Sequence, residues 1–287
     1  MSQQPLAYLS TEFLESAEGR PIRILSEYLE PLRRFKEQKI QDTVVFFGSA
    51  RVHSRERAER ALQTLRARGV RQADALYEEE LKKSRKALEW ARFYEDAREL
   101  ARLLTAWSVS LDAENHRFVV TSGGGPGIME AANRGAREAG GKTIGLNIRL
   151  PFEQGANPYI TEGLHFEFHY FFMRKFWFAY LAKALVIFPG GFGTCDELFE
   201  ILTLVQTDKL SKQIDVILYG SEYWDQVLNF APMAEWGAIA EYDLSLLHRV
   251  DSPSEAFERL HTHLQTKHLQ PATAQEAAAP GIAKTRG

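Results

Sequence analysis

The sequence predicts an α/β fold in which a doubly wound parallel sheet is covered by helices on both faces. Short apolar runs typical of buried strands alternate with longer amphipathic stretches along the chain. Glycine-rich or small-residue turns follow three of these runs, after Phe47, Thr121 and Phe188. With 287 residues, of which 45% are hydrophobic and 25% charged, the chain is long enough for one large domain with additional helices.

Two helical segments lie outside this alternating pattern. Residues 1–40 are expected to form an N-terminal helical extension, because apolar residues between Ile22 and Phe35 recur at about helical spacing. Residues 54–106 are rich in charge, and their spacing predicts a short helix followed by a longer amphipathic one. These helices have no obvious place in a standard doubly wound sheet. We therefore expect a helical insertion at about 54–106.

Three segments share a plan in which a strand is followed by a turn of small residues. They are "TVVFFGSAR" (43–51), "RFVVTSGGGPGIMEAANRGAREAG" (117–140) and "VIFPGGFGTCDELFEILT" (186–203). In the second and third a helix follows the turn. Because the carboxyl ends of parallel strands meet at one edge of a sheet, we expect the three turns to converge there, where ligands of such folds bind.

The remaining elements complete the α/β pattern up to about residue 270. Further strands are expected in "KTIGLNI" (142–148), "HFEFH" (165–169) and "IDVILYG" (214–220). Helices are expected at 170–183, 222–230 and 254–264. The α/β domain thus spans residues 41–270, and the small, polar segment 271–287 is expected to be disordered.

Composition and charge exclude several classes of function. A net charge of -3 and a pI near 6.3 give no general attraction to nucleic acid or to anionic membranes. The apolar runs fall short of the roughly 18 residues that a membrane span needs. One cysteine excludes an intrachain disulfide, and the first residues lack the pattern of a signal peptide. We expect a cytoplasmic protein that binds neither nucleic acid nor membrane and has no metal site.

The turn at Pro189–Gly193 allows two interpretations. Where a glycine-rich turn leads into a helix, unpaired N–H groups and the helix dipole favour an anion, and phosphate is the natural candidate. However, Thr194 to Glu197 also fits a capping box, which would explain both residues without any ligand. On this segment alone, the functional and structural interpretations both remain open.

Other nucleotide-binding and catalytic motifs match less well. The turn at residues 123–127 lacks the third glycine of G-x-G-x-x-G, and the strand at 142–148 ends near Asn147 without an acidic ribose ligand. No phosphate-binding G-x-x-x-x-G-K-[ST] motif occurs. Cys195 stands at an expected helix N-terminus, which favours a thiolate, but no matching histidine accompanies it.

Two long motifs resemble one known family. "SGGGPGIMEAANRGA" (122–136) and "PGGFGTCDELFEILT" (189–203) are similar to the paired signature of the LONELY GUY (LOG) family, the cytokinin riboside 5'-monophosphate phosphoribohydrolases, whose members are often labelled lysine decarboxylases. The resemblance covers about residues 43–265. It implies a Rossmann-like fold that hydrolyses the N-glycosidic bond of a nucleoside 5'-monophosphate without a cofactor. Phe171, where plant members usually have methionine, and the insertion resemble the longer bacterial type.

The resemblance also implies a set of site residues. Arg174 and Glu197 match the catalytic pair of the family. The residues expected to bind substrate are Ser49, Gly124, Gly125, Met129, Glu153, Lys175, Gly190, Gly191, Gly193, Thr194 and Thr203. For Met129, core packing is an equally good interpretation.

The proposed chemistry suits these residue types. Cleavage of an N-glycosidic bond develops positive charge on the ribose, and an ionised carboxylate stabilises that charge and orients or deprotonates water. We expect Glu197 to stay ionised because it lies in the first turn of a helix. A phosphate nearby would repel this carboxylate, so Arg174 and Lys175 are expected to neutralise and orient both anions.

Two other functions remain as alternatives. A carrier or sensor of a nucleotide or cofactor on the same fold would keep the glycine turns but would need neither Glu197 nor Arg174. A pyridoxal-dependent lysine decarboxylase is the weakest candidate, because no lysine lies in a recognisable Schiff-base context. We also expect a homo-oligomer, since the apolar stripes of the additional helices need a partner.

Overall fold

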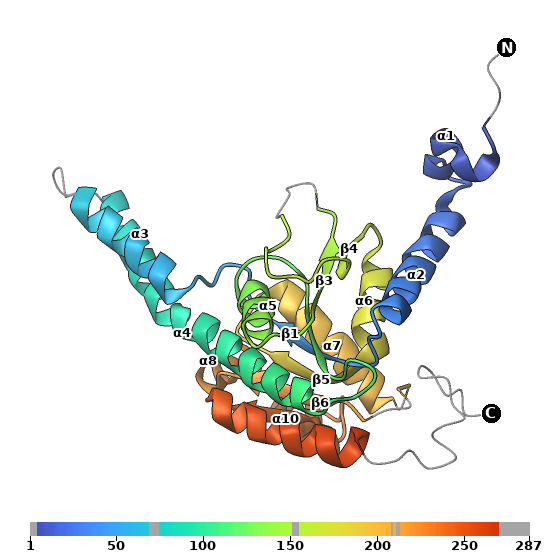
Figure 1. Ribbon diagram of the computed structural model, residues 1–287. Coiled ribbons are helices and arrows are strands. Elements are labelled where there is room, and N and C mark those ends of the chain that lie inside the picture. Colours follow the sequence, from blue (N-terminus) through green and yellow to red (C-terminus); the bar gives the residue numbers. More distant parts are fainter. Residues whose placement is uncertain (1–4, 69–74, 151–154, 208, 211–212, 270–287) are drawn as a thin grey trace.

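The protein is a three-layer α/β structure built around one parallel sheet (Figure 1). The computed structural model describes residues 5–68, 75–150, 155–207, 209–210 and 213–269. The seven strands follow the order β4-β3-β2-β1-β5-β6-β7, and all neighbours pair in parallel. The prediction of a doubly wound α/β sheet is confirmed.

The central strands are rich in apolar residues and almost entirely buried because helices cover both of their faces. The strands are β1 (Thr43–Phe47), β2 (Val119–Ser122), β3 (Thr143–Ile148), β4 (His165–Phe168), β5 (Ala182–Ile187), β6 (Asp215–Tyr219) and β7 (Leu247–Val250). All residues of β1, β2 and β6 are buried. In the edge strand β4, Phe166 and Phe168 are buried while His165 and Glu167 are exposed, as the alternation predicts.

Helices cover the two faces in separate groups (Figure 1). On one face, α2 (Arg20–Glu37), α6 (Phe171–Leu181) and α7 (Phe192–Gln206) pack on the strands. On the other face, α4 (Ala75–Ser110), α5 (Ile128–Glu138) and α10 (Pro253–His268) pack on alternate residues of the same strands.

The segment 54–106 forms α3 (Arg55–Arg68) and α4, a short helix followed by a long one as expected. The second half of α4 is nevertheless part of the sheet domain, since Phe93, Leu100 and Leu104 are buried in one core with residues of β1 and β2. The expectation that these helices have no place in the sheet was therefore wrong for that half. Its apolar stripe covers the sheet as the crossover between β1 and β2. Within this segment, α3 and the first half of α4 project from the domain (Figure 1).

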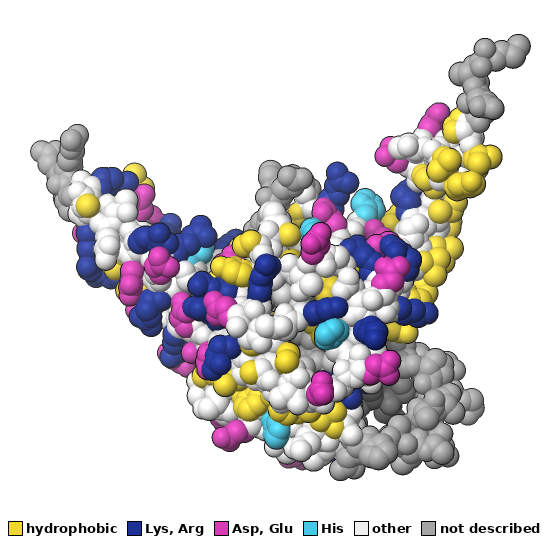
Figure 2. Space-filling view, in the orientation of Figure 1, with side chains coloured by type: hydrophobic (Ala, Val, Ile, Leu, Met, Phe, Trp, Pro, Cys, Tyr) yellow, Lys and Arg dark blue, Asp and Glu magenta, His cyan; other side chains and the backbone are white. Residues whose placement is uncertain are grey.

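The N-terminal extension also projects from the domain (Figure 1). It contains η1 (Ala7–Leu9), α1 (Thr11–Glu15) and α2. The middle of α2 is fixed to α6, where the Trp177 Nε1–H donates to the Glu27 carbonyl at 2.9 Å. Apolar side chains also follow the arm in the space-filling view (Figure 2). Leu25 and Leu29 of this arm are 56% and 55% exposed.

The chain returns to the middle of the sheet after β4. Because β5 pairs with β1 on the side opposite β2, the strand order reverses between β1 and β5. In open α/β sheets, ligands bind beyond the carboxyl ends of the strands at such a point. After β6 come α8 (Ser221–Val227), α9 (Ala231–Glu235), η2 (Glu241–Leu246), β7 and α10. None of the described helices is long and apolar enough to cross a bilayer.

Candidate functional site

The three turns meet at the reversal point of the sheet, as expected. Ser49, just after β1, joins the other two turns through its backbone. Its N–H donates to the Pro189 carbonyl at 3.0 Å, and its carbonyl accepts from the Ile128 N–H at 3.2 Å. Gly127 packs so closely on Ser49 and Ala50 that a side chain there would overlap their backbones. Ser49 therefore has a structural role that fixes the position of the whole site.

The second glycine turn is held mainly by the protein itself. The Gly124 N–H donates to Ser122 Oγ at 3.0 Å. The Asn157 side chain donates to the carbonyls of Gly124 and Gly125, both at 3.1 Å. Gly124 has a φ of 74° and lies against the Asn147 amide, so no other residue fits there without strain. The Gly124 N–H is thus already paired, and the two carbonyls are acceptors that offer a phosphate no donor.

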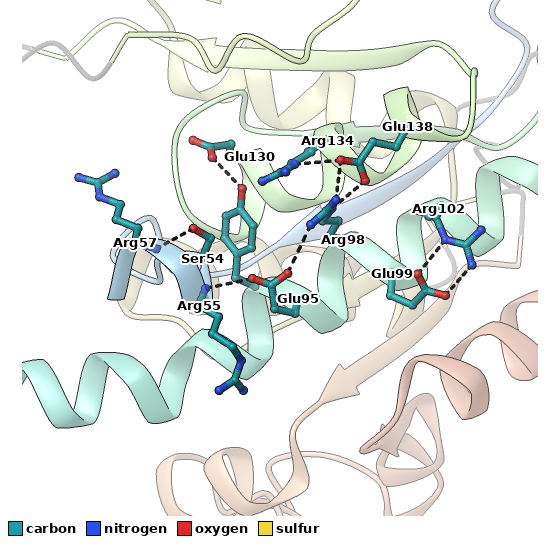
Figure 3. A network of polar contacts seen from close by, with 11 residues as sticks. Ser54, Arg55, Arg57, Glu95, Arg98, Glu99, Arg102, Glu130, Arg134 and Glu138 are labelled. Carbon is teal, nitrogen blue, oxygen red and sulfur yellow. Dashed lines mark hydrogen bonds and ion pairs between the residues drawn. The ribbon is translucent and has the colours of Figure 1, made fainter. Parts of the chain in front are cut away.

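Met129 and Glu130 begin the helix after this turn. The Met129 sulfur lies over Gly123, 2.7 Å from the position that a Cβ atom would occupy on this glycine. The Met129 side chain is half-buried. The Glu130 carboxylate accepts from the buried Tyr94 hydroxyl at 2.7 Å (Figure 3). The same close-up shows Arg98 and Arg134 bound to Glu138, which fastens α4 to α5 beside the site.

The third turn differs from the second because its helix start is open. Helix α7 begins at Phe192, with Gly191 as its N-cap and no side-chain cap. The predicted capping box of Thr194 and Glu197 was wrong, since the helix starts two residues earlier. Thr194 instead is buried against Gly190, leaving no room for a side chain on that glycine.

Gly191 and Gly193 face open space at the start of α7. A side chain added to either would meet no atom within 4 Å, and Phe192 between them is 97% exposed. The first N–H groups of a helix have no partner within the helix, and the helix dipole adds partial positive charge there. An anion can therefore approach the backbone at this position.

Arg174 and Glu197, the predicted catalytic pair, are brought together by α6 and α7. An Arg174 guanidinium nitrogen, Nη2, lies 2.8 Å from Glu197 Oε1, and the two side chains are only 15% and 6% exposed. The Phe171 and Phe178 rings each lie 5.5 Å from the guanidinium carbon. Arg174 Nε is buried without a hydrogen-bond partner among the described residues. The guanidinium thus retains a donor for a further acceptor.

Burial raises the pKa of the Glu197 carboxyl to about 7, although Arg174 and Lys175 favour its charged form. We expected the start of the helix to keep this group ionised. That reasoning was wrong in its premise, because Glu197 is the sixth residue of α7 and lies beyond the first turn. The dipole effect is confined to that turn, whereas burial disfavours the charge directly. Glu197 therefore exchanges a proton near neutral pH.

Lys175 is bound to acidic residues of α7. Its ammonium group lies 2.9 Å from Asp196 Oδ2 and 3.1 Å from Glu200 Oε2. Burial lowers the pKa of Lys175, but the hydrogen bonds to the two carboxylates outweigh this effect and raise it. Lys175 therefore links α6 to α7 and adds positive charge near Glu197.

One predicted substrate-binding residue, Thr203, is not brought into this arrangement. The Thr203 hydroxyl donates to the Phe199 carbonyl at 2.7 Å, and the side chain is exposed two turns further along α7. There it lines a separate groove with Phe199, Phe230 and Met233. Glu153 lies outside the described residues.

A nucleophilic cysteine and a metal centre receive no support from the described part of the chain. Burial raises the pKa of the half-buried Cys195 thiol, which disfavours a thiolate. Among the residues that the structure describes, no three His, Cys, Asp or Glu side chains are grouped so that they could hold a metal ion.

Sequence reasoning missed Tyr223 and Asn157, which hold two of the turns. The Tyr223 hydroxyl donates to the Gly190 carbonyl at 2.8 Å. Tyr223 lies 33 residues from that glycine, on α8, and no local motif marks it. Asn157 lies between the expected strands at 142–148 and 165–169, in a segment for which the sequence predicted no element. Asparagine before proline is a turn signal, but it does not reveal which distant backbone the side chain binds.

The sequence comparisons point to one family. A family model described as "Possible lysine decarboxylase" matches residues 129–260. The rice protein (Oryza sativa subsp. japonica) named cytokinin riboside 5'-monophosphate phosphoribohydrolase LOG is 30% identical over 130 residues, 43% of this chain and 50% of the rice protein. The chain thus spans half the length of the curated relative that it matches.

Similar solved structures include proteins described as molybdenum cofactor binders and carriers. The binding protein from Rippkaea orientalis is 17% identical, with a TM-score of 0.44 over 77% of this chain and 94% of that chain. The carrier protein from Chlamydomonas reinhardtii is 18% identical, with a TM-score of 0.43 over 78% and 99% of the two chains. Likeness at these scores carries no argument about function.

Proposed function

We propose, from the membership of the LOG family that the two sequence matches support, that this protein hydrolyses nucleoside 5'-monophosphates to a free base and ribose 5-phosphate. The observation that carries the proposal is the buried ion pair of Arg174 and Glu197 beside the open start of α7. The pair supplies a carboxylate for chemistry at C1', and the helix start supplies a site for the 5'-phosphate.

The phosphate binds at Gly191 and Gly193. Both glycines leave the backbone uncovered, so phosphate oxygens can approach the free N–H groups within hydrogen-bond distance. Arg174 lies at the same site and compensates the negative charge that phosphate and Glu197 bring together. Ser49 positions this cradle through its bond to the Pro189 carbonyl.

Glu197 acts as the general base. A base works best when its pKa lies near the operating pH, and the value of about 7 for Glu197 meets that condition. The carboxylate takes a proton from water as the water oxygen bonds to C1'. The N-glycosidic bond breaks, its electron pair leaves with the base, and the proton passes from Glu197 to the base nitrogen. The charged carboxylate also stabilises positive charge on the ribose in the transition state.

The substrates that we propose are AMP and N6-modified AMP, including cytokinin riboside 5'-monophosphates. The purified protein should be incubated with a panel of 5'-monophosphates and with the matching nucleosides. Chromatography should then detect free base and ribose 5-phosphate from AMP or its N6-modified form, and far slower cleavage of the nucleoside. Equal rates for AMP and adenosine would contradict the phosphate cradle. Tight AMP binding with no base released would indicate a carrier or sensor instead.

We also propose that the protein forms a homo-oligomer through the N-terminal arm. Five apolar residues on this arm are 41% to 65% exposed, namely Leu6, Leu9, Ile22, Leu25 and Leu29. Ile22, Leu25 and Leu29 follow helical spacing on α2 and therefore share one face of it. A contiguous apolar stripe of this kind is typical of an interface between subunits. Light scattering that reports a monomer at micromolar concentration would contradict this proposal.

A further inference from the structure

The glycine turn before α7 is held from outside by helix α8. The Tyr223 hydroxyl donates to the Gly190 carbonyl at 2.8 Å. The next residue, Trp224, is fully buried, and its Nε1–H donates to the Ile187 carbonyl at 3.2 Å and to the Tyr219 carbonyl at 3.1 Å. Trp224 therefore anchors α8 at the ends of β5 and β6, and Tyr223 reaches from that anchor to the turn.

The hydrogen bond from Tyr223 to the Gly190 carbonyl also determines the direction of the next N–H group. The carbonyl of Gly190 and the N–H of Gly191 belong to the same peptide unit, and none of the described peptide bonds is cis. In a trans peptide these two groups point in opposite directions. When Tyr223 fixes the carbonyl, it also fixes the direction of the Gly191 N–H, on the side away from α8.

A Gly-Gly peptide has little resistance of its own to rotation, because neither residue has a Cβ that restricts φ and ψ. A rotation of this peptide would turn the Gly191 N–H away from the open space at the helix start. The preceding peptide is already held, because the Ser49 N–H donates to the Pro189 carbonyl at 3.0 Å. The hydrogen bond from Tyr223 holds the second of the two peptides.

The ring of Tyr223 is itself fixed by packing. It contacts Trp90 of α4 edge to face, with ring centroids 5.6 Å apart, and Trp224 with centroids 5.1 Å apart. These contacts do not involve the hydroxyl. Replacing Tyr223 by phenylalanine therefore removes one hydrogen bond and keeps the packing.

We propose that Tyr223 is a positioning residue for anion binding, which aims the Gly191 N–H at the substrate phosphate through its bond to the Gly190 carbonyl. This inference rests on the proposed function for the identity of the anion, but it concerns binding rather than cleavage. If Tyr223 had only a structural role, replacing it would change the stability of α8 and would have no specific effect on phosphate affinity.

Tyr223→Phe tests this role by calorimetric binding of AMP and, separately, of inorganic phosphate. Loss of one hydrogen bond should weaken both affinities by about three- to tenfold. If AMP is a substrate, KM should rise by the same factor, with kcat within about twofold of wild type. Tyr242→Phe, at a position that is 75% exposed, serves as the matched control and should bind like wild type.

The outcomes separate this inference from the proposed function. Unchanged affinity of Tyr223→Phe for both anions would overturn the positioning role, whatever the activity. A fall in kcat with unchanged affinity would overturn it as well. If wild-type protein binds AMP without cleaving it, the proposed hydrolysis fails, while weaker binding by Tyr223→Phe would still support the role of Tyr223.

Discussion

Glu197→Gln should change the stability of the protein by an amount that depends on pH. Burial raises the pKa of the Glu197 carboxyl from 4.5 to about 7, so the unfolded chain loses this proton at a lower pH than the folded protein does. The folded protein holds this proton more tightly than the unfolded chain does, which adds to the free energy of unfolding. This contribution is complete below pH 4.5 and is lost as the pH rises toward 7. Glutamine has no proton to lose, so the variant lacks this decline.

The size of the effect follows from the two pKa values. The difference between 4.5 and about 7 is about 2.5 units, or about 3.4 kcal/mol at 1.36 kcal/mol per unit. Half of the unfolded carboxyls are already ionised at pH 4.5, so about 3 kcal/mol is measurable between pH 4.5 and 8.5. Arg174 loses its charged partner in the variant. The attraction of Arg174 is already included in the pKa of about 7, so loss of this partner shifts the stability of the variant equally at both pH values and leaves the pH-dependent difference unchanged.

Urea unfolding followed by tryptophan fluorescence measures this difference directly. Relative to wild type, Glu197→Gln should gain up to about 3 kcal/mol in free energy of unfolding between pH 4.5 and pH 8.5. Free energies that run parallel for the two proteins would refute the conclusion that burial controls the ionisation of Glu197.

Three further variants test separate parts of the structure. Gly193→Ala should raise the free energy of unfolding by up to about 1 kcal/mol, because alanine favours a helix and the added group meets no atom within 4 Å. It should also slow AMP hydrolysis by obstructing the phosphate, and normal turnover would contradict the cradle. Leu25→Glu should reduce the mass measured by light scattering, whereas Val109→Glu, at a similarly exposed position on α4, should not; an unchanged mass for Leu25→Glu would exclude the arm as the interface. Burial lowers the pKa of His268 from 6.5 to about 3, so the stability it contributes is complete above pH 6.5 and is lost as the pH falls. His268→Gln should therefore lose less unfolding free energy than wild type between pH 7 and pH 5, and an equal loss in urea titrations would contradict this assignment.

Much of the fold could be predicted because the central strands are continuous apolar runs between glycine turns. The strand β7 was missed, since its sequence "LHRV" contains His248 and Arg249 and lacks such a run. It forms a strand by pairing in parallel with β6, where Leu218 lies opposite Arg249. Tertiary pairing thus outweighs the weak local preference of this edge segment.

Local motifs identified the chemical groups of the site but not its boundaries. The glycines were found because each turn follows its strand directly, and the pair of Arg174 and Glu197 was implied by the resemblance to the LOG family. The start of α7 was placed at Thr194 because the sequence there fits a capping box, whereas close packing of Thr194 on Gly190 favours a start at Phe192. The burial that raises the pKa of Glu197 comes from the tertiary structure, so sequence spacing could not reveal it.

The most direct test of the proposed hydrolysis compares wild type with Glu197→Gln in AMP binding and in release of free adenine. Wild type should release adenine and ribose 5-phosphate. The variant should release them at least about 100-fold more slowly, because it lacks the general base. It should bind AMP at least as tightly as wild type, since one negative charge near the phosphate is removed. Adenine release by Glu197→Gln at the wild-type rate would contradict the assignment of Glu197 as the catalytic base.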